Sequence, residues 1–257
     1  MATYAVFGPT GKCGSSLIKL LLQTPDAKIH AYCRSKPKLR AAMPEAFESK
    51  RMEVFEGQIN DKKVFKNCIR GSKAIFLAVS MNANTPGFHA ARDTTVTLLN
   101  ALEDLKAEGM HMPKIVVLSS ASLEEKLCRN LPSWFHWAVL RANSNIYADL
   151  RQQEGMLKAE QDWLSSIFIK PGGLSVDVQR GHKLDLHEQE TFVSYLDLAA
   201  GMIEAADDSS DQYNMKDVTV RNVNGSARFP PTLPFLAFFG ILRHFFPWLH
   251  PFLPLLG

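Results

Sequence analysis

The sequence predicts an α/β fold in which helices cover both faces of a doubly wound parallel sheet. Three observations predict this class: short, continuously apolar runs, helical patterns between these runs, and a glycine-rich turn directly after the first run. Apolar strands that alternate with helices are typical of a parallel sheet buried on both sides. The chain has 257 residues, which suits one such domain, so we expect a single unit over residues 1–257.

The apolar runs place the strands, and the stretches between them place the helices. We expect strands at residues 3–7, 28–33, 52–56, 73–79 and 114–118. We expect helices at about residues 15–22, 61–69, 88–105 and 143–164. Right-handed crossovers wind such helices onto both faces of the sheet. The ligand crevice then lies at the carboxyl ends of the strands, so residues that follow a strand are candidates for function.

The first strand is followed by Gly-Pro-Thr-Gly-Lys-Cys-Gly over residues 8–14. Strand, glycine turn and helix in this order form the context of a dinucleotide-binding turn, with an ordinary glycine turn as the alternative. The first glycine allows a sharp exit from the strand, the second a close approach to a pyrophosphate, and the third close packing of the helix. The N–H groups and the dipole of the helix start favour phosphate. The residues expected to bind the cofactor here are Gly8, Thr10, Gly11, Lys12, Cys13 and Gly14.

The residues after the second strand indicate which dinucleotide binds. An acid at this position would hold the ribose 2′-hydroxyl of NAD, but the sequence there is Cys33-Arg34-Ser35-Lys36, without an acid. A guanidinium can instead bind a 2′-phosphate through two hydrogen bonds. We therefore expect NADP(H), with Arg34 as the main contact. A solvated basic loop is the alternative.

Composition excludes several other classes of function. The net charge is +3 and no basic stripe with interleaved aromatic residues is present, so nucleic-acid binding is not indicated. The four cysteines are scattered and have no histidine at metal spacing, so we expect no metal site and a reducing, cytoplasmic location. No secretory signal is expected, because the first residues lack a basic region that leads into an apolar run.

A family resemblance rests on the glycine turn, on the serines at 119–122 after the fifth strand, and on Tyr147 in the helix that follows. Together they resemble the short-chain dehydrogenase/reductase superfamily. Residues 166–174 look like the sixth strand and following turn of its atypical, NmrA-like branch, and residues 193–199 look like a helix start of that branch. The tail at 245–251 is similar to the averufin oxidase A family of fungal polyketide pathways.

The resemblance implies a Rossmann-type fold and an NADP(H)-dependent oxidoreductase that acts on an aromatic polyketide intermediate. Tyr147 would be the acid or base, and Ser120 or Ser122 would hold the substrate oxygen. Arg151 stands where the family has a lysine, one helical turn after the tyrosine. Lys158 is a second candidate base or cofactor contact, and Lys170 replaces an arginine of the family's strand-six turn as a cofactor contact. The alternative is that Tyr147 is an ordinary helix residue and that Arg151 and Lys158 are surface charges.

Further polar and aromatic residues are weaker candidates. Ser80 and Asn82 follow the fourth strand, where cofactor contact is expected, while the lone histidines His89 and His136 are expected to be structural. The aromatic-rich stretch at 131–137 would either line a pocket for a flat aromatic substrate or belong to the core. We expect a small substrate-binding portion at 172–228, after the sixth strand.

Residues 229–257 form an apolar segment that is rich in phenylalanine and proline. It is too short and too often broken by proline to span a membrane. A lid over the crevice or packing on another subunit is the preferred interpretation, and peripheral membrane contact is the second. Two other functions remain as alternatives: a redox-neutral isomerase or ring-opening enzyme, and a non-enzymatic regulator that senses NADP(H). Oligomeric state is not predicted.

Overall fold

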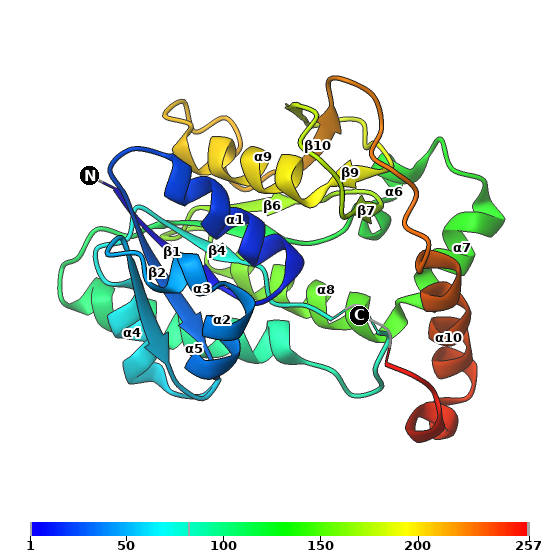
Figure 1. Cartoon of the computed structure of the whole chain (residues 1–257), viewed down its shortest axis with the longest axis horizontal. Helices are drawn as coiled ribbons and strands as arrows, with labels where there is room; N and C mark the ends of the chain where they lie inside the picture. The colour runs from blue at the N-terminus through cyan, green and yellow to red at the C-terminus, as the bar shows by residue number, and fades with distance from the viewer. Residues whose placement is uncertain (1, 82, 256–257) are drawn as a thin grey trace.

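The centre of the molecule is an eight-stranded sheet in the order β3-β2-β1-β4-β5-β6-β10-β8 (Figure 1). The structure, a computed structural model, describes residues 2–81 and 83–255. The pairs along the sheet are parallel except that of β10 with β8, which is antiparallel. The strands are β1 (Ala2–Phe7), β2 (Ala27–Cys33), β3 (Met52–Glu56), β4 (Ala74–Leu77), β5 (Lys114–Leu118), β6 (Ser166–Ile169), β8 (His182–Asp185) and β10 (Asp217–Asn222). The predicted α/β class with a doubly wound parallel sheet is confirmed.

Helices cover both faces of this sheet and bury its apolar side chains in two separate cores. One core packs under α1, α2, α3 and α9, and the other under α4, α5 and α8. Each layer buries whole apolar side chains, and this burial is the main favourable contribution to folding. The helices of the two layers are α1 (Lys12–Gln23), α2 (Lys36–Ala42), α3 (Pro44–Phe47), α4 (Lys62–Ile69), α5 (Ala90–Ala107), α8 (Ser144–Ala159) and α9 (Tyr195–Asp207).

Several elements differ in length from the prediction. The first helix begins at Lys12 rather than at residue 15, because the last three residues of the glycine turn already belong to it. Strand β4 ends at Leu77, two residues early, and the helix predicted over 143–164 is α8, which ends at Ala159. Short helices precede it: η1 (Ala121–Leu123), α6 (Glu125–Cys128) and α7 (Ser133–Ala142).

The segment at 172–228 does not form a separate unit. Its strands β8 and β10 continue the main sheet beyond β6, and α9 covers that sheet beside α1. Only β7 (Leu174–Ser175) and β9 (Val193–Ser194) form a small parallel ribbon of their own. The predicted substrate-binding portion is therefore an extension of the central sheet with a two-stranded addition.

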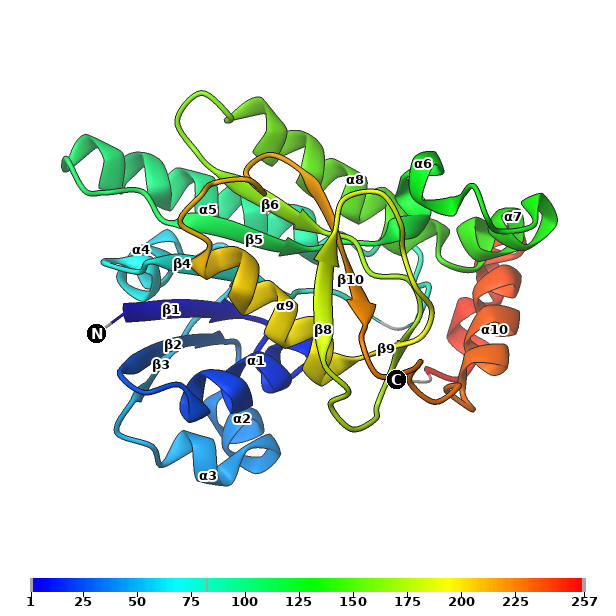
Figure 2. The same cartoon turned by 90° about the horizontal axis from the view of Figure 1, so that it is seen from above.

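The C-terminal segment lies beyond the carboxyl ends of the parallel strands, next to α7 (Figure 2). It contains α10 (Leu233–Phe245) and η2 (Pro247–Phe252). Gly240 allows α10 to approach the end of α7, because a Cβ at this position would lie 2.1 Å from the carbonyl oxygen of Ala142. Within the described residues, none of the helices is both long and apolar enough to cross a bilayer.

Candidate active site

The glycine turn between β1 and α1 has a geometry that only glycine satisfies at two positions. Gly8 has φ +84°, and a Cβ there would lie 2.5 Å from the carbonyl oxygen of Ala78. A Cβ on Gly14 would lie 2.1 Å from the carbonyl oxygen of Gly8. The Gly11 N–H donates to the same oxygen at 3.1 Å. The chain thus folds back on itself at Gly8, as a tight turn before a phosphate-binding helix requires.

The start of α1 is open to a phosphate group. Gly11 is the N-cap and has no side chain to accept from the first-turn N–H groups, and the first turn contains no acidic residue. Thr10, Gly11 and Lys12 are exposed. A Cβ at Gly11 would meet only the Gly8 oxygen, at 3.3 Å, so its outer side is free for a ligand. The turn and the helix start fit a dinucleotide pyrophosphate.

Cys13 takes part in this turn only through its backbone. Its thiol is buried and points to the sulfur of Met202 on α9, at 3.6 Å. Burial raises the pKa of this thiol to about 12, so it stays protonated and is shielded from a ligand. A phosphate at this position would meet the N–H group and not the side chain.

Arg34 lies directly after β2, at the edge where the crevice is expected. Its side chain is exposed, and it has no ion pair among the residues that the structure describes. Arg40 pairs with Glu48 at 2.6 Å, while Glu56 accepts the backbone N–H of Lys36 at 2.8 Å. The exposed side chains of Arg34, Lys36 and Lys38 have no ion pair among the described residues, and of these three only Arg34 offers a guanidinium, which can bind a phosphate through two hydrogen bonds.

Ser120 and Tyr147 meet beyond the end of β5, although 27 positions separate them in the sequence. The Ser120 hydroxyl donates to the phenol oxygen of Tyr147 at 3.3 Å, and the Ser122 N–H donates to the Ser120 hydroxyl at 3.3 Å. Burial raises the pKa of Tyr147, while hydrogen bonds from Ser120 and Ser122 act in the opposite direction. At neutral pH the side chain is therefore a phenol that carries a proton.

Arg151 and Lys158 lie on the same helix as Tyr147 but do not join this pair. Arg151 is exposed, and its guanidinium has no hydrogen bond to Tyr147 in the described part of the chain. Lys158 pairs with Glu154 at 3.3 Å. It lies about 16 Å from Tyr147 along the helix axis, since eleven residues rise 1.5 Å each. Lys158 therefore does not contact Tyr147, and its role as a base or cofactor contact stays a prediction.

Residues 8–209, which include the glycine turn, Arg34, Ser120 and Tyr147, match the model of a family described as NAD(P)H-binding. The chain belongs to this NAD(P)H-binding family. It is an oxidoreductase, and its fold is that of short-chain dehydrogenases/reductases.

Relatives and solved structures agree with this assignment. The chain is 54% identical over 260 residues to Oxidoreductase GME11367 of Pestalotiopsis microspora, covering 100% of this chain and 99% of the relative. It is 48% identical over 254 residues to Oxidoreductase tpcG of Aspergillus fumigatus, with 99% and 97% coverage.

Two solved structures share the fold. A short-chain dehydrogenase/reductase of Veillonella parvula superposes with a TM-score of 0.68 at 16% identity, over 90% of this chain and 98% of that chain. A structure of a Veillonella parvula short-chain dehydrogenase/reductase in complex with NADP superposes with a TM-score of 0.62 at 17% identity, with 90% and 99% coverage.

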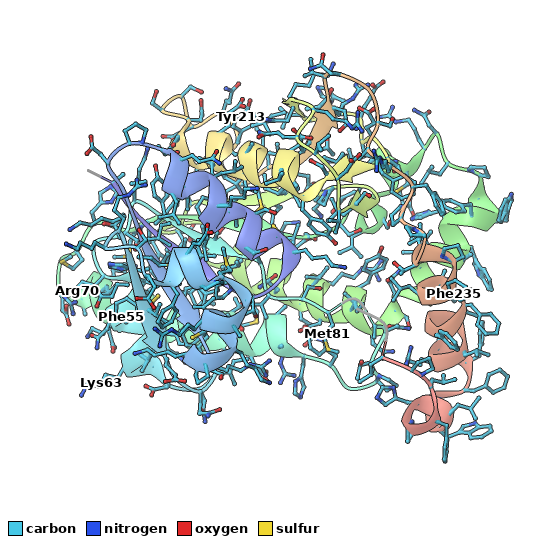
Figure 3. All side chains as sticks on the ribbon, viewed as in Figure 1. Phe55, Lys63, Arg70, Met81, Tyr213 and Phe235 are labelled. Carbon is cyan, nitrogen blue, oxygen red and sulfur yellow. The ribbon has the colours of Figure 1, made fainter. Side chains whose placement is uncertain are left out.

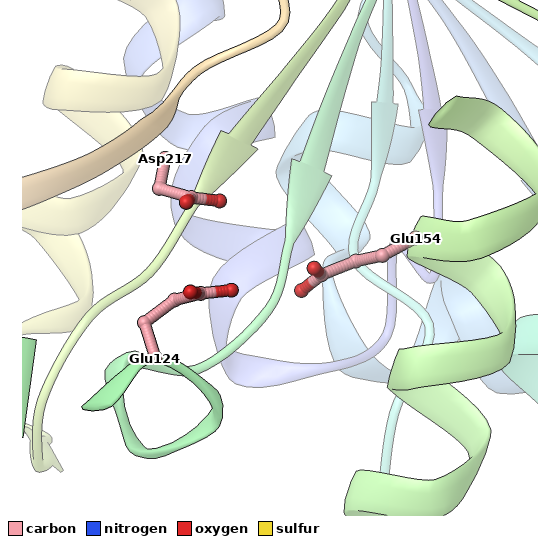
Figure 4. A group of neighbouring side chains, drawn as sticks. All are labelled: Glu124, Glu154 and Asp217. Atoms are coloured by element: carbon pink, nitrogen blue, oxygen red, sulfur yellow. The ribbon is translucent and has the colours of Figure 1, made fainter. Parts of the chain in front are cut away.

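Among the predicted site residues of this NAD(P)H-binding oxidoreductase, Lys170 differs most from its expected surroundings. Lys170 follows β6 as expected, but it is fully buried, and its ammonium lies 2.6 Å from Glu124, 2.9 Å from Glu154 and 3.2 Å from Asp217. Figure 4 shows the three carboxylates converging from separate parts of the chain. The expectation that Lys170 contacts the cofactor is thus wrong, because its charge is enclosed by these acids.

This buried ion cluster was missed from the sequence. Burial alone would lower the pKa of Lys170, but Glu154, Glu124 and Asp217 together hold it above its ordinary value. Lys170 occupies the position among the carboxylates that a metal ion would take, so the residues do not fit a metal centre. The cluster also reaches the site, since the hydroxyl of Ser119, the residue before Ser120, donates to Glu154.

The remaining candidates are Ser80, Asn82, His89 and His136. Ser80 is exposed just after β4 and its hydroxyl donates to the Met81 oxygen at 3.5 Å. Asn82 lies outside the described residues. His89 pairs with Asp93 at 3.3 Å and His136 bonds the Ser122 oxygen at 3.0 Å, so both have partners within the protein.

The aromatic-rich stretch partly lines a hollow between α6 and α7. The hollow has a volume of about 340 Å³, and its lining residues include Cys128, His136, Trp137 and Arg141. His136 connects it to the site through its bond to Ser122, two residues from Ser120. Trp134, in contrast, is 72% exposed and does not line it.

Proposed function

We propose that this oxidoreductase uses NADP(H) and reduces a carbonyl group of an aromatic polyketide intermediate. The observation that carries the proposal is the Ser120–Tyr147 pair, a proton-bearing phenol at the carboxyl end of β5, in the same sheet edge as the glycine turn. The hollow beside Trp137 and His136 supports a flat aromatic substrate. The many fungal relatives named as oxidoreductases favour an enzyme over a regulator.

The preference for NADP(H) rests on Arg34. Its exposed guanidinium follows β2, where the adenosine ribose of a dinucleotide lies in folds of this kind. A charge-assisted contact to a 2′-phosphate contributes about 1–3 kcal/mol, which corresponds to about 5- to 150-fold in affinity.

Calorimetric titration tests this preference. Arg34→Ala should weaken NADPH binding by about 5- to 150-fold and leave NADH binding nearly unchanged. Arg40→Ala is the matched control, because Arg40 lies on α2, directly after this loop, and is paired with Glu48. Equal losses for NADPH and NADH in Arg34→Ala would contradict the proposed role.

The chemistry follows from the protonation state of Tyr147. NADPH held at the glycine turn and Arg34 would supply the hydride for the carbonyl carbon. Tyr147 gives its proton to the carbonyl oxygen, so the carbonyl becomes an alcohol and the tyrosine is reprotonated from solvent. Ser120 donates to the phenol oxygen and stabilises the phenolate that forms. Because Arg151 is exposed, this stabilisation is supplied by the serine hydroxyls and not by a cation one turn away.

Turnover of a panel of aromatic ketones, followed by NADPH consumption and product mass, tests the reaction. Tyr147→Phe should lower kcat by at least about a hundredfold and leave NADPH affinity unchanged. Tyr213→Phe is the control, because Tyr213 is a partly buried tyrosine that packs against the core under α1 and α9. Unchanged turnover in Tyr147→Phe would refute the assigned role.

A redox-neutral reaction is the second candidate, and one observation favours it. The lysine that lowers the tyrosine pKa in the family is absent, and its replacement Arg151 does not reach the phenol. A phenol with a raised pKa is suited to protonating a substrate in an isomerisation or ring opening. Product formation without consumption of NADPH would favour this reaction, and stoichiometric loss of NADPH would exclude it.

A further inference from the structure

The exposed aromatic side chains of this protein gather on one part of its surface. Every strongly exposed tryptophan or phenylalanine among the described residues comes from α7 or from the segment after residue 228. We call this set the aromatic surface: Trp134, Phe135, Trp137, Phe229, Phe235, Phe238, Phe245, Phe246, Trp248 and Phe252. Figure 3 shows Phe235 projecting from α10 at the edge of the molecule. The four most exposed members are Phe252 at 81%, Trp134 at 72%, Trp248 at 68% and Phe235 at 59%.

Helix α10 packs on the protein through the side opposite to the aromatic surface. The inner side of α10 is already docked, with Gly240 against Ala142 and with His244 bonded to the Ser144 hydroxyl at 2.8 Å. Arg243, which is 2% exposed, holds the tail by donating to His250 at 3.0 Å and to the Pro254 oxygen at 2.7 Å. The aromatic side chains are therefore presented outward by a fixed scaffold.

The two segments that form the aromatic surface carry basic residues but no acidic ones. Residues 126–148 and 218–257 contain no aspartate or glutamate. They contain exposed Arg129 and also Arg141, whose guanidinium lies 4.8 Å from the centre of the Trp137 ring. A second copy of the chain would bring like charges together on an isologous interface, which costs free energy. The surface complements a partner that is apolar and negatively charged.

We propose that the aromatic surface binds the interfacial region of a lipid bilayer that contains anionic lipids. Tryptophan and phenylalanine side chains partition into this region, and arginine adds attraction to anionic head groups. The described helices include none that could cross the bilayer, so the contact is peripheral. The carboxyl ends of the parallel strands point toward α7 and α10 (Figure 2), so the docked protein opens its cofactor crevice beside the membrane.

Sedimentation with vesicles tests the proposal. The wild-type protein should sediment with vesicles of phosphatidylcholine and phosphatidylserine, and added salt should weaken this binding. The triple substitution Phe235→Ser, Phe238→Ser and Trp248→Ser should weaken binding about tenfold or more, because it removes exposed apolar area. Val96→Ser, at an exposed apolar position on α5, is the control and should bind as the wild type does.

Three further measurements make the result decisive. NADPH affinity and the melting temperature of the triple variant should equal those of the wild type, since the substituted side chains are exposed. Wild-type protein that stays in the supernatant with the mixed vesicles would overturn the proposal. Light scattering that finds a dimer, which the triple variant converts to a monomer, would also overturn it and assign the surface to self-association.

Discussion

Lys170→Met is the substitution that most directly tests the buried ion cluster. It removes the ammonium that lies within 3.2 Å of Glu124, Glu154 and Asp217 and replaces it with an apolar side chain. The three carboxylates converge within 4.8 Å of one another and would face each other without their central cation. Lys126 and Lys158 stay as their outer partners, but about half of each of these side chains is exposed.

The expected loss is large because the charges are buried. Removing one partner of a buried ion pair costs about 3–5 kcal/mol. For a protein of this size, 1 kcal/mol corresponds to about 2–4 °C, so the melting temperature should fall by about 6–20 °C. Lys158→Met is the matched control, because its 44% exposed side chain also pairs with Glu154. It should cost no more than about 1 kcal/mol.

Calorimetry or thermal circular dichroism at several pH values identifies the cause. Burial alone would raise the pKa of Asp217, but Lys170 and Lys126 hold it below its ordinary value. Its stabilisation is therefore present above about pH 4 and is lost as the pH falls. In Lys170→Met the carboxylate pKa values rise, so the difference in stability from the wild type should shrink between pH 7 and pH 4.5. Equal losses for Lys170→Met and Lys158→Met, or a difference that does not depend on pH, would refute this reasoning.

Two further substitutions test the scaffold of the site. Gly14→Ala should lower NADPH affinity at least about tenfold and lower the free energy of unfolding by about 1–3 kcal/mol, because its Cβ would lie 2.1 Å from the Gly8 oxygen. Gly155→Ala is the control, because its Cβ meets nothing within 4 Å. In the same titration and melting experiments, Gly155→Ala should leave NADPH affinity unchanged and should be neutral or slightly stabilising. Asp149→Ala should cost about 3 kcal/mol by denaturant unfolding, because buried Asp149 accepts the N–H groups of Ala91 and Arg92 at the start of α5, at 2.8 and 2.9 Å. Asp149→Asn should lose less stability than Asp149→Ala, because the asparagine side chain keeps one oxygen that can accept a hydrogen bond. Equal stability of Asp149→Ala and the wild type would contradict the capping role.

The sequence carried the sheet and the cofactor turn because both are local signals. Each strand forms its own apolar run, and the three glycines of the turn lie within seven residues directly after the first run. The contact between Gly14 and the Gly8 oxygen lies within this turn, whereas the close approach of Gly8 to Ala78 depends on the neighbouring strand. The pairing of Ser120 with Tyr147 was implied by the family resemblance, and the structure places the two hydroxyl groups 3.3 Å apart. These features could be predicted without knowing any distant contact.

The ion cluster and the docking of the C-terminal segment could not be predicted in this way. Nothing near Lys170 in the sequence indicates that Glu124 and Asp217, 46 and 47 positions away, will enclose its charge. Buried and solvated lysines look alike in a sequence, so the family's cofactor role was transferred to one that is enclosed. Likewise, the fit of Gly240 against Ala142 depends on atoms that the sequence places far apart.

Helix α8 joins features that are otherwise separate. Ser144, in its first turn, bonds His244 of α10, and Tyr147 follows three residues later. Asp149 then holds the start of α5, and Glu154 enters the ion cluster. One helix therefore carries a contact to the C-terminal segment, the phenol, the cap of α5 and an acid of the ion cluster. The place of the phenol beside Ser120 is set by the same backbone that these other contacts hold.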